Sequence, residues 1–246
     1  RDALRDLWGA LGGGVFCPSW GAGYRRVFLE SNVTICWLFE VVVKLVPQDG
    51  MPVQVASIYG CRVRVACIGG VEIDGDHRGA GHAGACLEDA IAVAKADGAD
   101  LMIISGDRSL YRRAGCRRVG QDFSAALPRR PGPAEDVTLR DATEDDIPTL
   151  RAVHHAEPIP WKRDPDTWRR ALACGWVMNR KSRFLIVEGD AGDAAYFIAP
   201  EDMAADSALQ ISEYAGDRRA LMAAFARQAA HAGAAGVRWH ISGHDG

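Results

Sequence analysis

A glycine-rich segment, residues 78–83 (Arg-Gly-Ala-Gly-His-Ala), contains the residue types needed to hold a phosphate. Glycine has no Cβ, so the backbone N–H groups around it can approach an anion closely. Where such a segment opens a helix, the free N–H groups and a dipole equivalent to roughly +0.5 charge favour a negative ligand. Arg78 adds a guanidinium at the same place. The segment therefore predicts a diphosphate-binding loop.

One interpretation of this loop is a dinucleotide site. Gly79, Gly81 and Gly84 spell GxGxxG, and Asp107 follows about twenty residues later, as in nicotinamide-binding proteins. In those proteins the strand normally runs straight into the first glycine. Here residues 74–78 intervene, and the preceding pattern predicts antiparallel β structure. This context disfavours the dinucleotide interpretation.

The second interpretation takes Arg78, Gly81 and Ala83 as [Q/R]xxGx[G/A], a loop that holds the pyrophosphate of coenzyme A. The stretch 68–87 strongly resembles the GNAT N-acetyltransferase superfamily. Residues 110–116 (Leu-Tyr-Arg-Arg-Ala-Gly-Cys) resemble its later (F/L)YxxxGF motif, with cysteine in place of the last aromatic residue. The two motifs stand in the expected order and at about the expected distance.

The resemblance implies an α/β (α+β) fold of GNAT type, a mixed and mostly antiparallel sheet flanked by helices. It also implies an acyl-CoA-dependent N-acyltransferase that moves acetyl from acetyl-CoA directly to a primary amine, on a small molecule or a lysine. Residues expected to contact the coenzyme are Val71, Glu72, Ile73, Arg78, Gly79, Ala80, Gly81, His82, Ala83, Gly84, Gly106 and Asp107.

Tyr111 matches the family tyrosine that protonates the thiolate of the departing coenzyme A. A thiol pKa of about 8.5 and a phenol pKa of about 10 make that proton transfer feasible. The general base is left open among Glu72, Asp74, a carboxylate from elsewhere and a water relay. Within the strand 71–73, a free N–H would stabilise the oxyanion of the reacting carbonyl.

The proline-rich segment 128–133 marks a predicted linker. We expect a catalytic domain over residues 1–127, a linker over 128–136 and a degenerate GNAT-like domain over 137–246. The helix–turn–strand pattern of residues 95–105 recurs at residues 231–242, and the layout resembles Eis-like and mycothiol-synthase-like tandem acetyltransferases. The second domain is expected to bind no coenzyme A, because its corresponding loop lacks the glycine pair and Asp217 would repel phosphate.

Composition narrows the function classes. The formal net charge is −3 without an evident basic stripe, which disfavours nucleic acid as a partner. No apolar run reaches the roughly 18 residues of a membrane span. Seven scattered cysteines fit a reducing cytoplasm, and the histidines show no metal-ligand spacing, so no metal is expected. Homo-oligomerisation stays open, as do two alternative functions, a non-catalytic acyl-CoA sensor and a nucleotide-dependent oxidoreductase.

Overall fold

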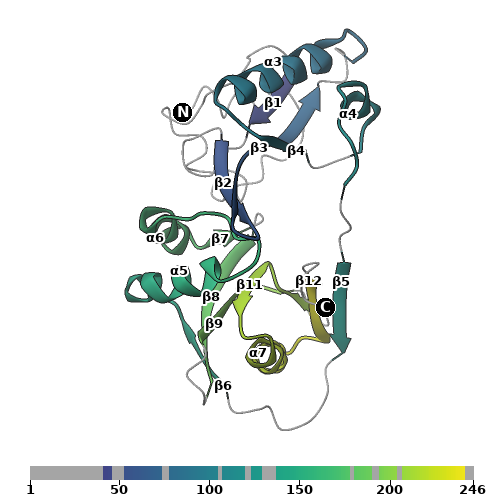
Figure 1. Cartoon of the computed structure of the whole chain (residues 1–246). Helices are drawn as coiled ribbons and strands as arrows, with labels where there is room; N and C mark the ends of the chain where they lie inside the picture. The colour runs from purple at the N-terminus through teal and green to yellow at the C-terminus, as the bar shows by residue number, and fades with distance from the viewer. Residues whose placement is uncertain are drawn as a thin grey trace. The chain divides into compact units, whose positions relative to one another are not determined.

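The computed structural model describes residues 41–45, 53–73, 78–104, 107–119, 123–128, 137–177, 180–189, 194–203 and 207–241. The chain forms two compact units that divide between Val119 and Gly120. Each unit contains a mixed arrangement of strands with helices packed against it (Figure 1). The α+β fold class predicted from the sequence is confirmed.

The sheet of the first unit is built around one long strand. Its strands are β1 (Val41–Leu45), β2 (Val53–Ile58), β3 (Cys61–Ile73) and β4 (Leu101–Ile104). β2 pairs antiparallel with residues 61–66 of β3 and β1 with residues 68–73, while β4 pairs parallel with residues 65–68. Because the β4 pairing overlaps both of the others, β1 and β2 share one edge of β3 and β4 takes the opposite edge. The antiparallel β structure predicted before the turn is thus a hairpin of β2 and β3, and β3 continues to Ile73.

Two helices cover this sheet. α3 (His82–Ala96) packs on β1 and β3 and buries Leu87, Ala90 and Ala94, which share one helical face because they are three and four residues apart. α4 (Ser109–Arg113) follows β4 and places Tyr111 in the same apolar cluster as Leu87. The helix–turn–strand pattern predicted over residues 95–105 is confirmed by the end of α3 and by β4.

The second unit contains a larger antiparallel sheet in the order β11-β9-β8-β6 and a smaller one in the order β10-β12-β5. Its strands are β5 (Phe123–Pro128), β6 (Val137–Asp141), β7 (Trp176–Val177), β8 (Arg180–Gly189), β9 (Ala194–Pro200), β10 (Ala208–Gln210), β11 (Glu213–Gly216) and β12 (Gly236–Ile241). The sequence analysis assigned residues 123–127 to the first domain. β5 instead pairs antiparallel with β12, so the boundary between the units falls before β5 and not in the proline-rich segment after it.

Helices cover both faces of the larger sheet. They are the 3₁₀ turn η3 (Glu144–Asp146) with α5 (Ile147–His155) and α6 (Pro165–Cys174) on one face, and α7 (Arg218–His231) on the other. Side chains of a strand alternate between faces. Phe184 and Ile186 accordingly pack with α5 and α6, whereas Leu185 and Val187 pack with α7.

Both units contain the same strand–helix–strand pattern. In the first it is β3–α3–β4, and in the second it is β10 and β11, then α7, then β12. Both helices lead through a glycine of positive φ, Gly98 at 74° and Gly233 at 64°, into the next strand. β4 pairs parallel with β3, and β12 pairs parallel with β10. This correspondence agrees with the internal similarity seen in the sequence.

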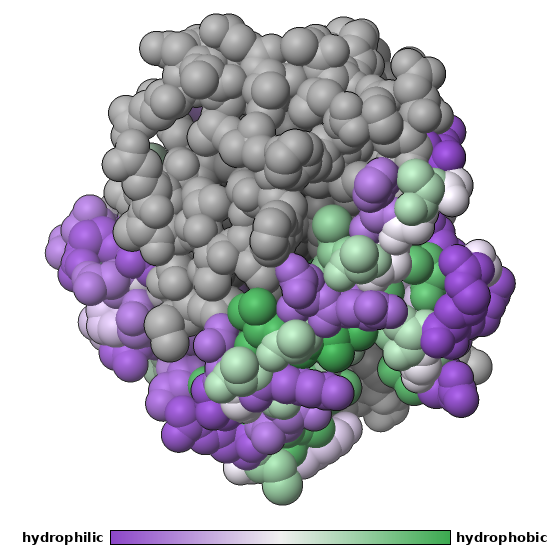
Figure 2. Space-filling model, turned by 90° about the horizontal axis from the view of Figure 1, so that it is seen from above, coloured by the Kyte–Doolittle hydropathy of each residue, from purple (hydrophilic) through white to green (hydrophobic). Residues whose placement is uncertain are grey.

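The described surface mixes polar and apolar side chains. In Figure 2 hydrophobic areas lie between hydrophilic ones. Apolar atoms contribute more than half of the accessible surface of an ordinary folded protein, so this is expected. None of the described helices is long and apolar enough to cross a membrane.

A buried polar network links β9, β11 and α5 in the second unit. Arg163 holds Glu213 through two short hydrogen bonds of 2.6 and 2.7 Å. The Tyr196 hydroxyl donates to Glu213 at 2.6 Å and lies 2.8 Å from Nδ1 of His154, whose Nε2 lies 2.9 Å from the Trp161 carbonyl oxygen. The network satisfies polar groups that would otherwise be costly to bury.

Two groups of this network have pKa values below their ordinary ranges. Burial, and then the positive charge of Arg163, lower the pKa of His154 to about 4. Burial acts to raise the pKa of Glu213, but the charge of Arg163 and the hydrogen bonds from Arg163 and Tyr196 outweigh it and lower that pKa to about 2. In the unfolded chain both groups therefore bind protons at a higher pH than in the folded unit, and acid favours unfolding.

We predict that the thermal stability of the protein falls as the pH is lowered from about 6.5 to 4, the window between the ordinary and folded pKa of His154. His154→Gln removes this titrating group, so the decline in melting temperature over that window should become shallower. His231→Gln, on an exposed histidine of α7, is the control and should leave the pH profile unchanged. Melting curves recorded by circular dichroism test this, and equal declines in all three proteins would contradict it.

Candidate active site

The glycine-rich turn enters α3 without a cap. Gly79 and Gly81 have φ values of 87° and 86°, a left-handed region that non-glycine residues rarely adopt. Gly81 is the N-cap residue of α3. No side chain caps the helix, and no acidic side chain lies in its first turn. Arg78 is exposed directly before these glycines. The turn therefore presents a helix N-terminus that is open to an anion.

β3 loses one neighbour before it reaches this turn. Its pairing with β4 ends at Ile68 opposite Ile104, whereas its pairing with β1 continues to Ile73. The register with β1 shifts between residues 69 and 72, where β3 carries an extra residue, as in a β-bulge. Along residues 69–73, the β4-side edge of β3 has no pairing among the described strands.

The structure describes the side chains of only some of the predicted site residues. Val71, Glu72 and Ile73 do lie on the strand that leads to the turn, but their side chains, like Gly106, lie outside the described parts. The turn and first helical positions (Arg78, Gly79, Ala80, Gly81, His82, Ala83 and Gly84) lie together at the N-terminus of α3. The role of Glu72 as a base therefore stays a prediction.

Tyr111 has a buried side chain. It is 6% exposed and packs in a cluster with Ile68, Leu87 and Ala90. Its hydroxyl makes no hydrogen bond with any described residue. A tyrosine whose hydroxyl is not engaged by these residues can give a proton to a bound molecule.

Asp107 is already engaged by the protein. Its carboxylate accepts a hydrogen bond from Arg112 at 2.9 Å and lies 3.6 Å from a guanidinium nitrogen of Arg118. All three side chains are largely exposed, so these pairs contribute little to stability. An acidic group with two arginine partners is poorly suited to receive a ribose hydroxyl, which weakens the dinucleotide interpretation.

A basic surface around α4 was missed in the sequence analysis. Five arginines occur within eleven residues, and all are exposed: Arg108, Arg112, Arg113, Arg117 and Arg118. Asp107 is the only acidic residue within the described segment 107–119. The formal charge of the whole chain conceals this cluster, although counting arginines in a short window would have found it.

The corresponding places of the second unit are filled by its own side chains. Asp217 caps α7 by accepting a hydrogen bond from the Ala220 N–H at 2.6 Å. Glu157 accepts hydrogen bonds from the Gly216 N–H at 2.8 Å and from Arg218 at 2.7 and 2.9 Å.

The strands there are also bridged. The Tyr214 hydroxyl of β11 donates to the His240 carbonyl oxygen of β12 at 2.9 Å. The Arg218 guanidinium lies 5.1 Å from the centre of the Tyr214 ring, a cation–π contact. Glu157 thus serves the interior of its own unit.

Among the described residues, other nucleophiles and metal ligands do not converge at the turn. Burial, and then Asp89, raise the pKa of the Cys86 thiol, which keeps it protonated and weakly nucleophilic. His82 is exposed. Over the part of the chain that the structure describes, no three His, Cys, Asp or Glu side chains gather in a way that could hold a metal ion.

Comparison with solved structures identifies the fold, whereas no family model and no curated protein matches the chain. A GCN5-related N-acetyltransferase from Kribbella flavida aligns at a TM-score of 0.60 and 18% identity, over 83% of this chain and 50% of its own. A protein of unknown function from Enterococcus faecalis, described as a probable N-acyltransferase, aligns at 0.64 and 17%, over 84% and 53%. Eis1 from Mycobacterium abscessus aligns at 0.52 and 12%, over 90% and 61%.

The chain therefore has the fold of the GCN5-related N-acetyltransferases, as its resemblance to the GNAT superfamily implied. It spans about half the length of the first two of these structures. Identities below one fifth establish the architecture, and the chemistry has to be argued from the site itself.

We predict that Gly81→Ala destabilises the protein by about 1–2 kcal/mol, because alanine is strained at a φ of 86° although no atom would crowd its Cβ. Gly84→Ala is the matched control. Gly84 lies inside α3 with open space around it, so alanine there should be neutral or stabilising by up to about 1 kcal/mol. Urea denaturation measures both, and equal effects would contradict the geometry assigned to the turn.

Proposed function

We propose that the protein is an acyl-CoA-dependent N-acyltransferase that transfers acetyl from acetyl-CoA directly to a primary amine. The observation that carries this proposal is the uncapped, glycine-rich N-terminus of α3 at the end of a strand whose β4-side edge is unpaired beyond Ile68. The helix end suits a diphosphate, and the strand edge suits the amide groups of a pantetheine arm. One ligand that carries both groups is coenzyme A.

The proposed reaction follows from this placement. The diphosphate binds the N–H groups of residues 79–84, and the thioester carbonyl lies against residues 71–73, where a backbone N–H stabilises the developing oxyanion. The neutral amine attacks the carbonyl carbon, the C–S bond breaks, and Tyr111 donates its proton to the leaving thiolate. The proton lost by the amine passes to Glu72 or to water.

The charges around the turn support an anionic donor. Coenzyme A carries several phosphate charges, and Arg78 together with the five arginines of residues 108–118 gives the described part of this region a positive surface. Such a surface raises the rate of encounter with an anionic ligand and makes it sensitive to salt. In the second unit Asp217 and Glu157 take the equivalent positions, which supports a single donor site per chain.

Two further features support the finer assignments. The raised pKa of the Cys86 thiol favours direct transfer over an acyl-cysteine intermediate. The described cysteines Cys61, Cys67, Cys86 and Cys116 form no disulfide, which supports a reducing, cytoplasmic location.

The donor assignment predicts that acetyl-CoA binds with one site per chain in calorimetry and that Arg78→Gln weakens binding about tenfold, as expected for loss of a charge-assisted contact to phosphate. Arg219→Gln removes the same charge from the first turn of α7 and is the matched control, expected to bind normally. Binding of NAD(P)H without binding of acetyl-CoA would overturn the proposal in favour of a nucleotide-dependent oxidoreductase.

The catalytic assignment predicts that Tyr111→Phe lowers kcat by roughly 100- to 10,000-fold, the usual contribution of a positioned general acid. The dissociation constant for acetyl-CoA should change little, because the ring packing is retained and the hydroxyl has no described partner to lose. Release of free thiol over a panel of primary amines measures kcat. Absence of turnover in the parent protein across that panel, with acetyl-CoA still bound, would indicate an acyl-CoA sensor.

A further inference from the structure

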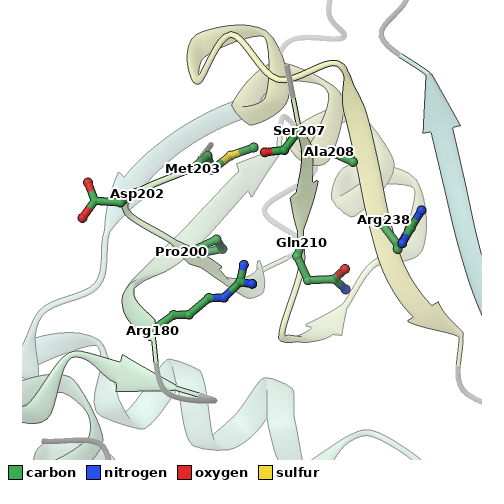
Figure 3. Close-up of a pocket in the computed structure, with 8 residues that line it drawn as sticks. All are labelled: Arg180, Pro200, Asp202, Met203, Ser207, Ala208, Gln210 and Arg238. Atoms are coloured by element: carbon green, nitrogen blue, oxygen red, sulfur yellow. The ribbon is translucent and has the colours of Figure 1, made fainter. Parts of the chain in front are cut away.

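The second unit contains a cavity of its own. It has a volume of about 440 Å³, within the range of small-molecule sites, and is lined by Arg180, Pro200, Asp202, Met203, Ser207, Ala208, Gln210 and Arg238 (Figure 3). These residues come from the start of β8, the end of β9, the segment between β9 and β10, β10 itself and β12.

The topology of the second unit explains why this space is open. β9 pairs with β11 up to Ile198, opposite Glu213, and the Ser212 N–H still reaches the Ile198 carbonyl oxygen. Beyond that point β9 pairs only with β8 among the described strands, while β10 pairs with β12. The larger and the smaller sheet therefore separate between β9 and β10. Pro200 at the end of β9 has no N–H with which to continue a ladder.

The charge of the cavity lining is positive. Neither the Arg180 nor the Arg238 guanidinium has a hydrogen-bond or ion-pair partner in the described chain. Elsewhere in the same unit carboxylates hold Arg140, Arg163, Arg183 and Arg218. Two arginines without a carboxylate partner among the described residues thus line one cavity.

The nearby acids do not neutralise these arginines. Glu201 forms an ion pair with Lys181 at 2.6 Å. In Figure 3 the carboxylate of Asp202 points away from the other lining side chains, whereas the Arg180 guanidinium reaches toward Gln210. Gln210 stands opposite Arg238 in the pairing of β10 with β12, so the positive groups flank an amide.

We propose that this cavity binds a small organic anion, with Arg180 and Arg238 holding a carboxylate or phosphate group and Pro200, Met203 and Ala208 contacting a short apolar body. Guanidinium groups suit such oxyanions because their N–H donors match the two acceptor oxygens. The volume fits a compact metabolite. This proposal does not rest on the proposed acyl-CoA site, and each of the two can be tested without the other.

Calorimetry at constant ionic strength, with succinate and inorganic phosphate as probes, tests this proposal. We expect at least one probe to bind with one site per chain below about 20 mM, and Arg180→Gln or Arg238→Gln to weaken it about tenfold. Lys162→Gln removes an exposed positive charge of the same unit outside the cavity, and it should bind the probe as the parent does. Preference for succinate or for phosphate identifies the head group.

Three outcomes would overturn the proposal. They are the absence of binding by both probes, unchanged binding in Arg180→Gln and Arg238→Gln, and loss of binding in Arg78→Gln instead. The last result would place the anion on the glycine turn. Circular dichroism of each variant separates loss of binding from loss of folding, and retained acetyl-CoA binding in the Arg180 and Arg238 variants shows that the first unit is intact.

Discussion

The separation of β3 from β4 is the constraint on which the site depends. A strand inside a sheet normally pairs along both edges, but β3 keeps β1 to residue 73 and loses β4 after residue 68. Backbone N–H and C=O groups that leave a ladder need another partner, because leaving them unsatisfied when buried costs free energy. A ligand with amide groups can supply that partner. The bulge in β3 lies in the same stretch and turns the strand locally.

The second unit has the same strand–helix–strand pattern, but its own side chains fill the places that are open in the first unit. Between β11 and β12 the Tyr214 hydroxyl reaches the His240 carbonyl oxygen, and Asp217 and Glu157 supply the negative charge at the start of α7. These carboxylates interact favourably with the helix dipole and would repel a phosphate. In the first unit the N-terminus of α3 is open to a ligand, whereas in the second unit carboxylate side chains fill the N-terminus of α7. This difference supports assigning the donor site to the first unit alone.

The two units also differ in how their titratable side chains are hydrogen-bonded. In the second unit His154, Tyr196 and Glu213 form a closed hydrogen-bonded set with Arg163, which shifts their pKa values and makes stability depend on pH. In the first unit Tyr111 has a buried ring and a hydroxyl without a hydrogen-bond partner among the described residues. A satisfied network stabilises its unit, whereas an unsatisfied hydroxyl with a fixed position is available for proton transfer.

The sequence by itself determined the local parts of this protein. The glycine turn at residues 79 and 81 and the helix–turn–strand pattern of residues 95–105 each depend on residues close in the chain, so spacing was enough to predict them. The features that depend on contacts between residues far apart in the chain were decided by the tertiary structure alone. The pairing of β5 with β12, the contact of Glu157 with Gly216 and the cavity between β9 and β10 join segments that no local pattern connects. Strand partners are chosen by packing and register over long chain separations, and periodicity within one strand carries no information about them.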